Sequence, residues 1–544
     1  MGIGTLCSDF ANWGTVVGLP HIANSKNKKW MFWWTIVFLI LLGVFLYELW
    51  LMISTLLSYP SAVNTKILSD LQRFPAVTIC NQNPYKKSVV NSSFPSMKNM
   101  LADYEKAISI DNAGTTYPPY TFGGSDDDYI TQWKGTTWLS MEAAKLDVSV
   151  LKTAMYSFDD LIAECQFNGQ ECKEADFTPI IDPIYGQCFS FNYDASSTYN
   201  TSRAGMKFGL KLIITPRVSE KPTDWTAANA HTEKVDYLPT TWLAGARVFI
   251  GSSGDYPQMF GSGQNIPVGY QTGISITSSK IIRAPPPCGE CDDDNGAPNY
   301  YPDYTYSMET CFDTCRQKLT QDTCGCSNPR YPKGDGPDYC TGANTDNILC
   351  MLKLQGDQAN TNNPNKDLLA SCGCTPACNE NTFGVTMSLA QFPAQGYDLP
   401  ITGRPEFLCD LDTSAADYAI QAANCKNWVS NNALQMIVYF STLKFERYTE
   451  ECSYTMQDLI NDLGGHAGLW LGLSVISVVE CVGFLIILIL FCFSCGGMNM
   501  RPSDSEFHDD RTNDLDEMDK ELDAREQRHE SLKKRRRSSS SSDD

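Results

Sequence analysis

Cysteine is the residue whose number and spacing point most directly to chemistry in this sequence. The 544-residue chain contains 22 Cys and only five His, and 18 of the cysteines fall between Cys80 and Cys452. An even number of cysteines at this density is typical of disulfides formed in an oxidising compartment. Zinc is the alternative, but the cysteines do not form two separated pairs of the usual finger spacing. We therefore expect a disulfide-stapled extracellular region and no metal site.

Side chains suited to catalysis are sparse. Of the five histidines, only His231 lies clearly outside the membrane-associated and terminal segments. No nucleophile elbow, metal motif or phosphate-binding loop accompanies it. We expect no enzyme activity, no cofactor and no nucleic-acid partner.

Three groups of acidic residues stand out. Glu480 lies within a long apolar run, where an ionisable side chain is costly unless it faces water or a partner. Residues 126–128 and 292–294 are both Asp-Asp-Asp. If these two runs met, they would form a carboxylate pocket with raised proton affinity. Both lie in turn-rich sequence, which favours the alternative of solvated acidic turns.

Two apolar segments must position these groups. Residues 30–57 contain Glu48 as their only charge, and a second run covers 466–493. Each exceeds the roughly 20 residues that a helix needs to cross a bilayer. A buried core helix usually carries a polar stripe, which neither segment has. The first run is too long for a signal peptide, and the preceding lysines, including Lys28 and Lys29, favour a cytoplasmic N-terminus.

This topology divides the chain into five parts. Residues 1–29 form a cytoplasmic N-terminus, 30–57 the first span, 58–465 the extracellular domain, 466–494 the second span and 495–544 a cytoplasmic tail. About −17 of the formal charge of −21 lies between the spans, which would concentrate cations near a pore mouth or simply solubilise a secreted domain. Both chain ends are then cytoplasmic.

Within the extracellular domain, short apolar runs at 209–214 and 246–250 predict strands. Helices are predicted over 141–163 and 306–319. Sequons at Asn91 and Asn200 are candidate glycosylation sites. The charged tail predicts disorder, and its basic cluster at 533–537 is either a contact to anionic membrane lipid or a solvated charge run.

Residues 74–81, Phe-Pro-Ala-Val-Thr-Ile-Cys-Asn, closely resemble the signature that follows the first span in the degenerin/epithelial sodium channel/acid-sensing channel family. Further matches follow in the family's order at Cys165 and Cys172, Gly186–Phe189 with Phe191 and Asn192, Ala244–Gly245, Pro267 with 269–272, Pro285–Pro287, and 464–474. These matches run from the first span to the second.

The resemblance implies an integral membrane α+β fold. Two transmembrane helices would carry a large, disulfide-rich, β-based extracellular domain with palm, finger and thumb regions, the thumb at about 286–380. Three subunits would surround one axis, as a homotrimer or as a heterotrimer with related subunits, with the second span lining the pore. The implied function is a sodium-selective, amiloride-sensitive cation channel of the plasma membrane.

The resemblance also implies a disulfide pairing that spacing alone does not fix. The implied pairs are Cys80–Cys188, Cys165–Cys172, Cys291–Cys378, Cys311–Cys374, Cys315–Cys372, Cys324–Cys350 and Cys326–Cys340. The last five would stiffen the thumb as a ladder. Four extracellular cysteines remain, and we hypothesise two extra bridges, Cys409–Cys425 and Cys288–Cys452, the latter tying the base of the thumb to the strand before the second span.

The second span resembles the family's pore segment. Gly472, Leu473 and Ser474 match its selectivity tract, in which small residues allow close approach and a helix interruption turns carbonyl oxygens toward sodium. Taken alone, the same three residues would indicate only helix packing. Glu480 matches a family acidic position and would form a ring of three carboxylates, whereas a second acidic position of the family is Gly483 here.

Further positions carry roles over from the family. Gly468 matches a position linked to amiloride block, and Asn461 matches a site where large side chains hold channels open. The His-Gly pair that precedes the first span in the family is Val17-Gly18 here, so that only Gly18 keeps the re-entrant backbone role.

The opening stimulus is inferred from the resemblance and from what the sequence lacks. The region after the first span lacks the histidine of proton-gated relatives, which favours an invertebrate-type channel gated by a neuropeptide such as an FMRFamide-like ligand. Proton gating and mechanical gating are the alternatives. A two-span receptor or adhesion protein without ion conduction is the alternative from another class.

Overall fold

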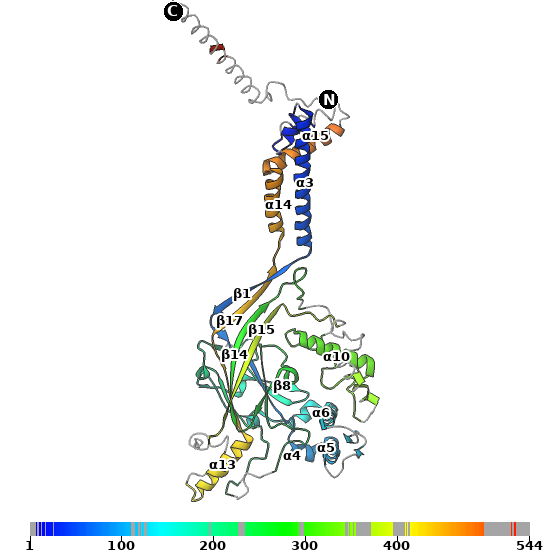
Figure 1. The fold of residues 1–544 in the computed structure, drawn as a ribbon. Helices are drawn as coiled ribbons and strands as arrows, with labels where there is room; N and C mark the ends of the chain where they lie inside the picture. The colour runs from blue at the N-terminus through cyan, green and yellow to red at the C-terminus, as the bar shows by residue number, and fades with distance from the viewer. Residues whose placement is uncertain are drawn as a thin grey trace, which may run out of the picture. The chain divides into compact units, whose positions relative to one another are not determined.

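A computed structural model describes the chain as two compact units (Figure 1). The helical unit comprises Met1–Ser58 and Tyr454–Asp544, and the β unit comprises Tyr59–Ser453. The described residues are 7, 10–11, 14–16, 18–25, 27–109, 115–117, 120, 122–123, 128–194, 196, 199–222, 224–226, 234–291, 293, 299–342, 346–347, 349–351, 353–354, 372–394, 409, 411, 414–493, 524 and 527–528.

The larger sheet of the β unit has eight strands. Seven follow the order β1-β17-β14-β16-β11-β6-β7, and β15 also pairs with β14. The strands are β1 (Ser61–Ser69), β6 (Ile162–Phe167), β7 (Gln170–Glu171), β11 (Leu210–Ile214), β14 (Tyr270–Ile282), β15 (Asn379–Gln391), β16 (Leu434–Phe440) and β17 (Lys444–Cys452). The antiparallel β14–β15 pair runs from Tyr270↔Gln391 to Ile282↔Asn379. Strand β1, which follows the first long helix in sequence, pairs along its whole length with β17.

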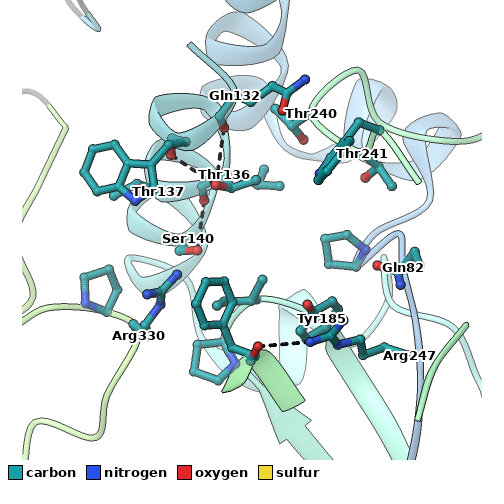
Figure 2. Close-up of a pocket in the computed structure, with 18 of the residues that line it drawn as sticks. Gln82, Gln132, Thr136, Thr137, Ser140, Tyr185, Thr240, Thr241, Arg247 and Arg330 are labelled. Carbon is teal, nitrogen blue, oxygen red and sulfur yellow. Dashed lines mark hydrogen bonds between the residues drawn. The ribbon is translucent and has the colours of Figure 1, made fainter. Parts of the chain in front are cut away.

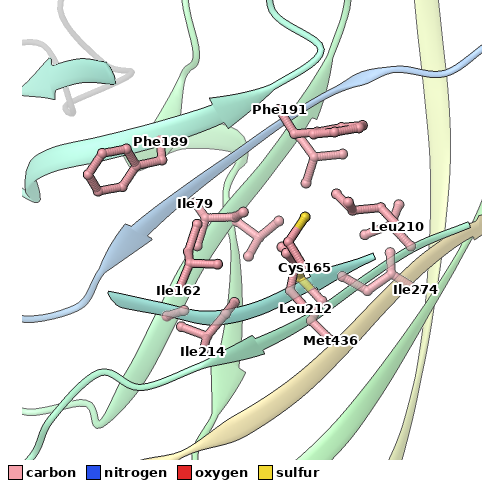
Figure 3. Close-up of a cluster of buried hydrophobic side chains, with 14 of the residues drawn as sticks. Ile79, Ile162, Cys165, Phe189, Phe191, Leu210, Leu212, Ile214, Ile274 and Met436 are labelled. Carbon is pink, nitrogen blue, oxygen red and sulfur yellow. The ribbon is translucent and has the colours of Figure 1, made fainter. Parts of the chain in front are cut away.

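A second sheet supplies the other half of the core. Its order is β13-β12-β3-β9-β8, formed by β13 (Gln264–Pro267), β12 (Gly245–Gly251), β3 (Ala76–Asn81), β9 (Gly186–Phe191) and β8 (Phe177–Asp182). All six residues of β3 are buried, and the two polar ones, Thr78 and Asn81, form side-chain hydrogen bonds to Ser190 and to the Pro216 oxygen. Side chains such as Ile79 and Phe191 from this sheet pack against Leu212 and Met436 from the larger sheet (Figure 3).

A helical layer forms a second core. Its elements are α4 (Lys87–Ser93), α5 (Pro95–Ile108) and α6 (Asp128–Ala144). The buried residues of α5 are Met97, Met100, Leu101 and Tyr104, which have the spacing of one helix face. These pack against Trp138 of α6 and against Met351, so the helices share a core with the segment that follows α10.

Short elements complete the β unit. The helices are α7 (Val148–Leu151), α8 (Phe158–Leu161), α9 (Met259–Ser262), α10 (Met308–Cys324) and α13 (Tyr418–Asn432), with 3-10 turns at Glu174–Asp176 and Met206–Phe208. Two small sheets pair β2 (Gln72–Arg73) with β10 (Asn200–Thr201), and β4 (Thr116–Tyr117) with β5 (Phe122–Gly123).

The predicted strands are confirmed as β11 and β12, and the helix predicted over 306–319 is confirmed as α10. The helix predicted over 141–163 is wrong. Helix α6 begins at Asp128 and ends at Ala144, and Asp147 and Ser157 then cap two separate short helices. Residues from Ile162 onward form β6, because pairing with β11 places this apolar run inside the sheet core.

The described part of the helical unit includes the helices α2 (Leu19–Ala23), α3 (Lys28–Leu57), α14 (Met456–Leu471) and α15 (Val475–Phe493). Helix α3 is long and apolar enough to cross a membrane. Helices α14 and α15 reach that length and apolarity only when they are taken together as one bent pair. The start of the second predicted span differs from the structure, because helix begins at Met456, ten residues before the expected 466. An interruption at 472–474, which the resemblance implied, is present between α14 and α15.

Candidate functional site

The break between α14 and α15 falls on Gly472, Leu473 and Ser474, and the two helices are bent by 83°. Gly472 adopts a left-handed backbone conformation (φ 61°), which glycine reaches without a Cβ clash. The Gly472 N–H donates a hydrogen bond to the Gly468 oxygen (3.1 Å), and the Leu473 N–H donates one to the Ala467 oxygen (3.1 Å). The glycine thus ends α14.

Ser474 begins the next helix. Its Oγ accepts a hydrogen bond from the N–H of Ser477 (3.2 Å), and the Oγ of Ser477 accepts one from the N–H of Ser474 (3.2 Å). This reciprocal pattern is a capping box built from two serines. The tract predicted to form the selectivity filter is therefore a helix stop followed directly by a helix start.

The C-terminal end of α14 presents oxygen atoms beside this break. The last carbonyl groups of a helix have no partner within it and carry the negative end of the helix dipole. Among the backbone hydrogen bonds of the described residues, none reaches the carbonyl oxygens of Leu469, Trp470 or Leu471. Such oxygens can replace part of the hydration shell of a cation.

Glu480 lies on α15 and is held by the N-terminal segment. Its Oε2 accepts hydrogen bonds from the N–H of Thr15 (3.0 Å) and from the Oγ1 of Thr15 (2.9 Å). The Oγ1 of Thr15 also lies 2.7 Å from the Oγ of Ser477, whose side chain is fully buried. One threonine therefore joins the predicted acidic residue to the serine that caps α15.

Further contacts fasten the N-terminal segment within the helical unit. Gly18 has φ 102°, and a Cβ there would lie 3.3 Å from the Cδ2 atom of Phe38. It precedes α2, as expected for a turn that only glycine forms without strain. The rings of Phe10 and Phe484 stack at 4.2 Å. The predicted re-entrant glycine thus belongs to a segment that packs against both α3 and α15.

The remaining predicted pore residues lie on α14 and α15. Asn461 and Gly468 are exposed on α14. A Cβ at Gly468 would come no nearer than 3.7 Å to the Leu473 oxygen, and one at Gly483 would meet nothing within 4 Å. These positions are open in a single chain, where a neighbouring molecule or a blocker would find room.

The β unit contains nine disulfides, and their pairing is the one set out from the sequence. Cys80–Cys188 joins β3 to β9, and Cys165–Cys172 closes the β6–β7 hairpin. The five thumb pairs are Cys291–Cys378, Cys311–Cys374, Cys315–Cys372, Cys324–Cys350 and Cys326–Cys340. Two of these bridges, Cys311–Cys374 and Cys315–Cys372, join α10 to the segment that leads into β15.

The two hypothesised bridges are also present. Cys409 pairs with Cys425 of α13, in the same core cluster as Trp225 and Trp428, whose rings meet edge to face. Cys288 pairs with Cys452, the last residue of β17. The next residue, Ser453, donates its N–H to the Pro60 oxygen (2.8 Å). The end of β17 is therefore fastened to both the chain after β14 and the chain before β1.

Other predicted positions are less informative. Asn91 on α4 and Asn200 in β10 are both exposed. In the acidic runs, Asp126, Asp127, Asp292 and Asp294 lie outside the described residues, whereas Asp293 accepts the Cys378 N–H (2.8 Å). Nearly all of the tail lies outside the described residues too. In the part of the chain that the structure describes, no group of three His, Cys, Asp or Glu side chains is arranged to hold a metal.

Sequence reasoning missed three carboxyl groups around α10, of which Asp182 and Asp313 are buried and Asp255 is partly buried. Burial raises the pKa of Asp313 on α10, of Asp255 before α9 and of Asp182 at the end of β8. Asp255 also forms an isolated bridge with Thr305, just before α10. No local pattern indicates these residues, because each becomes buried only when distant segments pack together.

Thr15 and Ser477 were missed as well. The spacing of Ser474 and Ser477 fits a capping box and could have revealed the helix start. Thr15 carries no local signal, since its partners lie more than 460 residues away.

Comparison with known proteins agrees with this geometry. Residues 10–484 match the family described as "Amiloride-sensitive sodium channel". The chain is 40% identical to "Degenerin-like protein asic-2" of Caenorhabditis elegans over 536 residues, which cover 97% of this chain and 95% of that protein. It is 30% identical to "Degenerin mec-10" and 31% identical to "Degenerin deg-1" of the same organism, covering 67% and 61% of this chain but 46% and 39% of those longer proteins.

The family match spans both apolar helical regions and the disulfide-rich β unit between them. It confirms the resemblance carried by residues 74–81 and 464–474. The chain belongs to the amiloride-sensitive sodium channel family, the degenerin/epithelial sodium channel group of membrane cation channels.

Proposed function

We propose that three copies of this chain, or this chain with related subunits, form a two-span, sodium-selective channel of the plasma membrane that amiloride blocks. The observation that carries the proposal is the Gly472–Ser474 break, where a helix end rich in free carbonyl oxygens meets a capped helix start. Three such breaks around one axis would surround a cation with backbone oxygens, and small side chains would allow the close approach.

Glu480 supplies the charge for this path in our proposal. Three copies would place three carboxylates six residues, about 1.7 turns of helix, beyond Ser474. The hydrogen bonds from Thr15 bind this carboxylate to the N-terminal segment, which gives Gly18 and its neighbours a means of influencing the pore. Both chain ends lie in the cytoplasm in this arrangement.

The extracellular stimulus in our proposal is a peptide. Disulfides that join α10 to the β15 segment, and Cys452 to Cys288, make the β unit stiff enough to transmit a binding event to β17. Proton gating is the second candidate. Asp182, Asp255 and Asp313 favour it, because desolvation raises the pKa of each carboxyl above that of an exposed one.

Expression in oocytes with two-electrode recording tests the function. We expect inward sodium current that amiloride blocks, evoked by one of a panel of peptides or by acid. A larger side chain at Asn461, such as Asn461→Phe, should increase resting current if this position has the family role. Surface-expressed protein that carries no current under any of these conditions, also when expressed with related subunits, would favour a receptor without ion conduction.

A further inference from the structure

A cavity of about 340 Å³ lies within the β unit, where segments that are distant in sequence meet. Its wall includes α6, the turn between β8 and β9 at 183–185, the segment 240–243 and the segment 328–330 that follows α10 (Figure 2). The other lining residues are Gln82, Pro84, Tyr85, Arg247, Phe260, Asn265 and Met351. The size of the cavity is at the lower end of the range of ligand pockets in proteins. A small molecule, or the last residues of a peptide, fits this volume.

Arg330 provides a cation at this cavity with unused hydrogen-bonding capacity. Its guanidinium lies over the Phe260 ring, 3.9 Å from the ring centroid. In the described structure this guanidinium has neither a hydrogen bond nor an ion pair, although the Arg330 backbone N–H is held by Asn328 Oδ1 (3.0 Å). Stacking uses the face of the guanidinium and leaves its N–H edge free, the edge that binds a carboxylate with two parallel hydrogen bonds.

Arg247 adds a second positive charge in a fixed position. Its guanidinium donates to the oxygens of Met259 (2.8 Å), Phe260 (3.0 Å) and Asn265 (2.6 Å). Because these hydrogen bonds hold Arg247 in place, its positive charge attracts an anion electrostatically, but each of its guanidinium nitrogens already donates a hydrogen bond. Arg330 and Arg247 lie on opposite sides of the view in Figure 2, and the Arg247 guanidinium lies 5.9 Å from the centroid of the Tyr185 ring.

The nearby acids do not neutralise Arg330 by direct pairing. Asp182 is absent from the cavity wall, and its carboxylate accepts the N–H groups of Ile184 (2.8 Å) and Tyr185 (2.9 Å). The Asp313 carboxylate forms an ion pair with Arg316 (3.3 Å) and accepts a hydrogen bond from Gln258 Nε2 (3.3 Å). The wall of the cavity therefore carries two arginines and no carboxylate.

Aromatic side chains form the apolar part of the wall. Trp133 of α6, Trp242 and Phe260 line the cavity, and Trp242 and Phe260 remain 70% and 56% exposed. Large aromatic groups left open to water beside a cation are typical of a surface that binds a ligand with a charged end and an apolar body.

We propose that this cavity binds an extracellular ligand that carries a carboxylate on an apolar body, with the carboxylate on Arg330 and the body against Trp133 and Trp242. The proposal rests on the proposed function and adds the chemistry of the stimulus. An amidated, arginine-containing peptide would bring a cation against Arg330, so the site selects a free acid over such a peptide. A bound ligand would join α6 to the 328–330 segment.

Binding to the purified full-length protein in nanodiscs tests the site without requiring current. The probes are phenylacetate and its uncharged counterpart phenylacetamide, followed by N-acetyl-Gly-Phe with a free or an amidated C-terminus. Tryptophan fluorescence and the melting temperature report binding. Arg330→Gln removes the positive charge that would bind the carboxylate. Arg330→Lys keeps the charge but cannot form two parallel hydrogen bonds. Arg203→Gln is the matched control, because Arg203 stacks on Phe208 (5.5 Å) outside the cavity wall.

We expect phenylacetate, the acid peptide or both to bind the wild type and Arg203→Gln, and neither amide to bind. Arg330→Gln should raise the dissociation constant at least about tenfold, with a smaller increase for Arg330→Lys. The acid that binds more tightly shows whether the natural ligand resembles a small organic acid or the C-terminal end of a peptide. Equal binding of acid and amide, unchanged affinity in a folded Arg330→Gln protein, or no binding of any acid would overturn the proposal. Sodium current is recorded separately, so loss of the site and loss of channel function are distinguishable.

Discussion

Gly472→Ala should disable the helix break while leaving the protein folded. Gly472 has φ 61°, and an alanine in that left-handed conformation costs about 1–2 kcal/mol. Alanine is also favoured over glycine by up to about 1 kcal/mol inside a continuous helix. Both effects disfavour the broken conformation, by about 2 kcal/mol per chain. This lowers the equilibrium constant between the broken and the continuous helix roughly 30-fold. In a trimer the three contributions would add.

The assay is sodium current in oocytes, normalised to surface expression measured by biotinylation. We expect Gly472→Ala to reduce the current by at least about tenfold at equal surface expression. Gly483→Ala is the matched control, because a Cβ there meets nothing within 4 Å and the residue lies inside α15. Wild-type current and sodium selectivity in Gly472→Ala, at wild-type surface levels, would refute the reasoning.

Three further outcomes follow from the contacts described above. Thr15→Val removes the hydroxyl that contacts Glu480 and Ser477. Because this site is partly exposed, we expect the free-energy difference between the closed and open states to change by about 1 kcal/mol. Single-channel records should show this as a roughly fivefold shift in resting open probability. Burial raises the pKa of Asp182, so its ionised form destabilises the fold. The melting temperature of the wild type relative to Asp182→Asn should therefore rise as the pH falls from neutral toward the ordinary carboxyl pKa of 3.8. Cys288→Ser, Cys452→Ser and the double variant break the same bridge, so each should lose about the same 2–5 kcal/mol in denaturant unfolding, whereas additive losses would contradict the pairing.

The sequence predicted those parts of the fold that depend on local pattern or on a shared signature. Strands β11 and β12 and helix α10 follow from apolar runs and spacing, and the apolar stretch at 30–57 coincides with α3 apart from two residues. The disulfide pairing came from the family resemblance, since 18 cysteines have too many pairings for spacing to decide. The helix predicted over 141–163 failed because α6 starts earlier and tertiary pairing turned Ile162–Phe167 into β6.

The candidate site was predicted in its position but not in its mechanism. Gly472, Ser474 and Glu480 were identified from the resemblance, yet the bend depends on a left-handed glycine and a two-serine cap that apolarity alone conceals. The Thr15–Glu480 bonds connect opposite ends of the chain. The cavity at Arg330 is assembled from many segments that are distant in sequence, so neither its shape nor its charge is visible in any one of them.

The most direct test of the central claim is the reversal potential with sodium outside and potassium inside, compared between the wild type and Ser474→Leu. If the Gly472–Ser474 break forms the selective part of a sodium pathway, the wild-type current reverses at a positive potential. The bulky substitution then shifts the reversal toward zero, by about 59 mV for each tenfold loss of selectivity. A reversal potential that is the same in both proteins, at comparable current, would contradict the account.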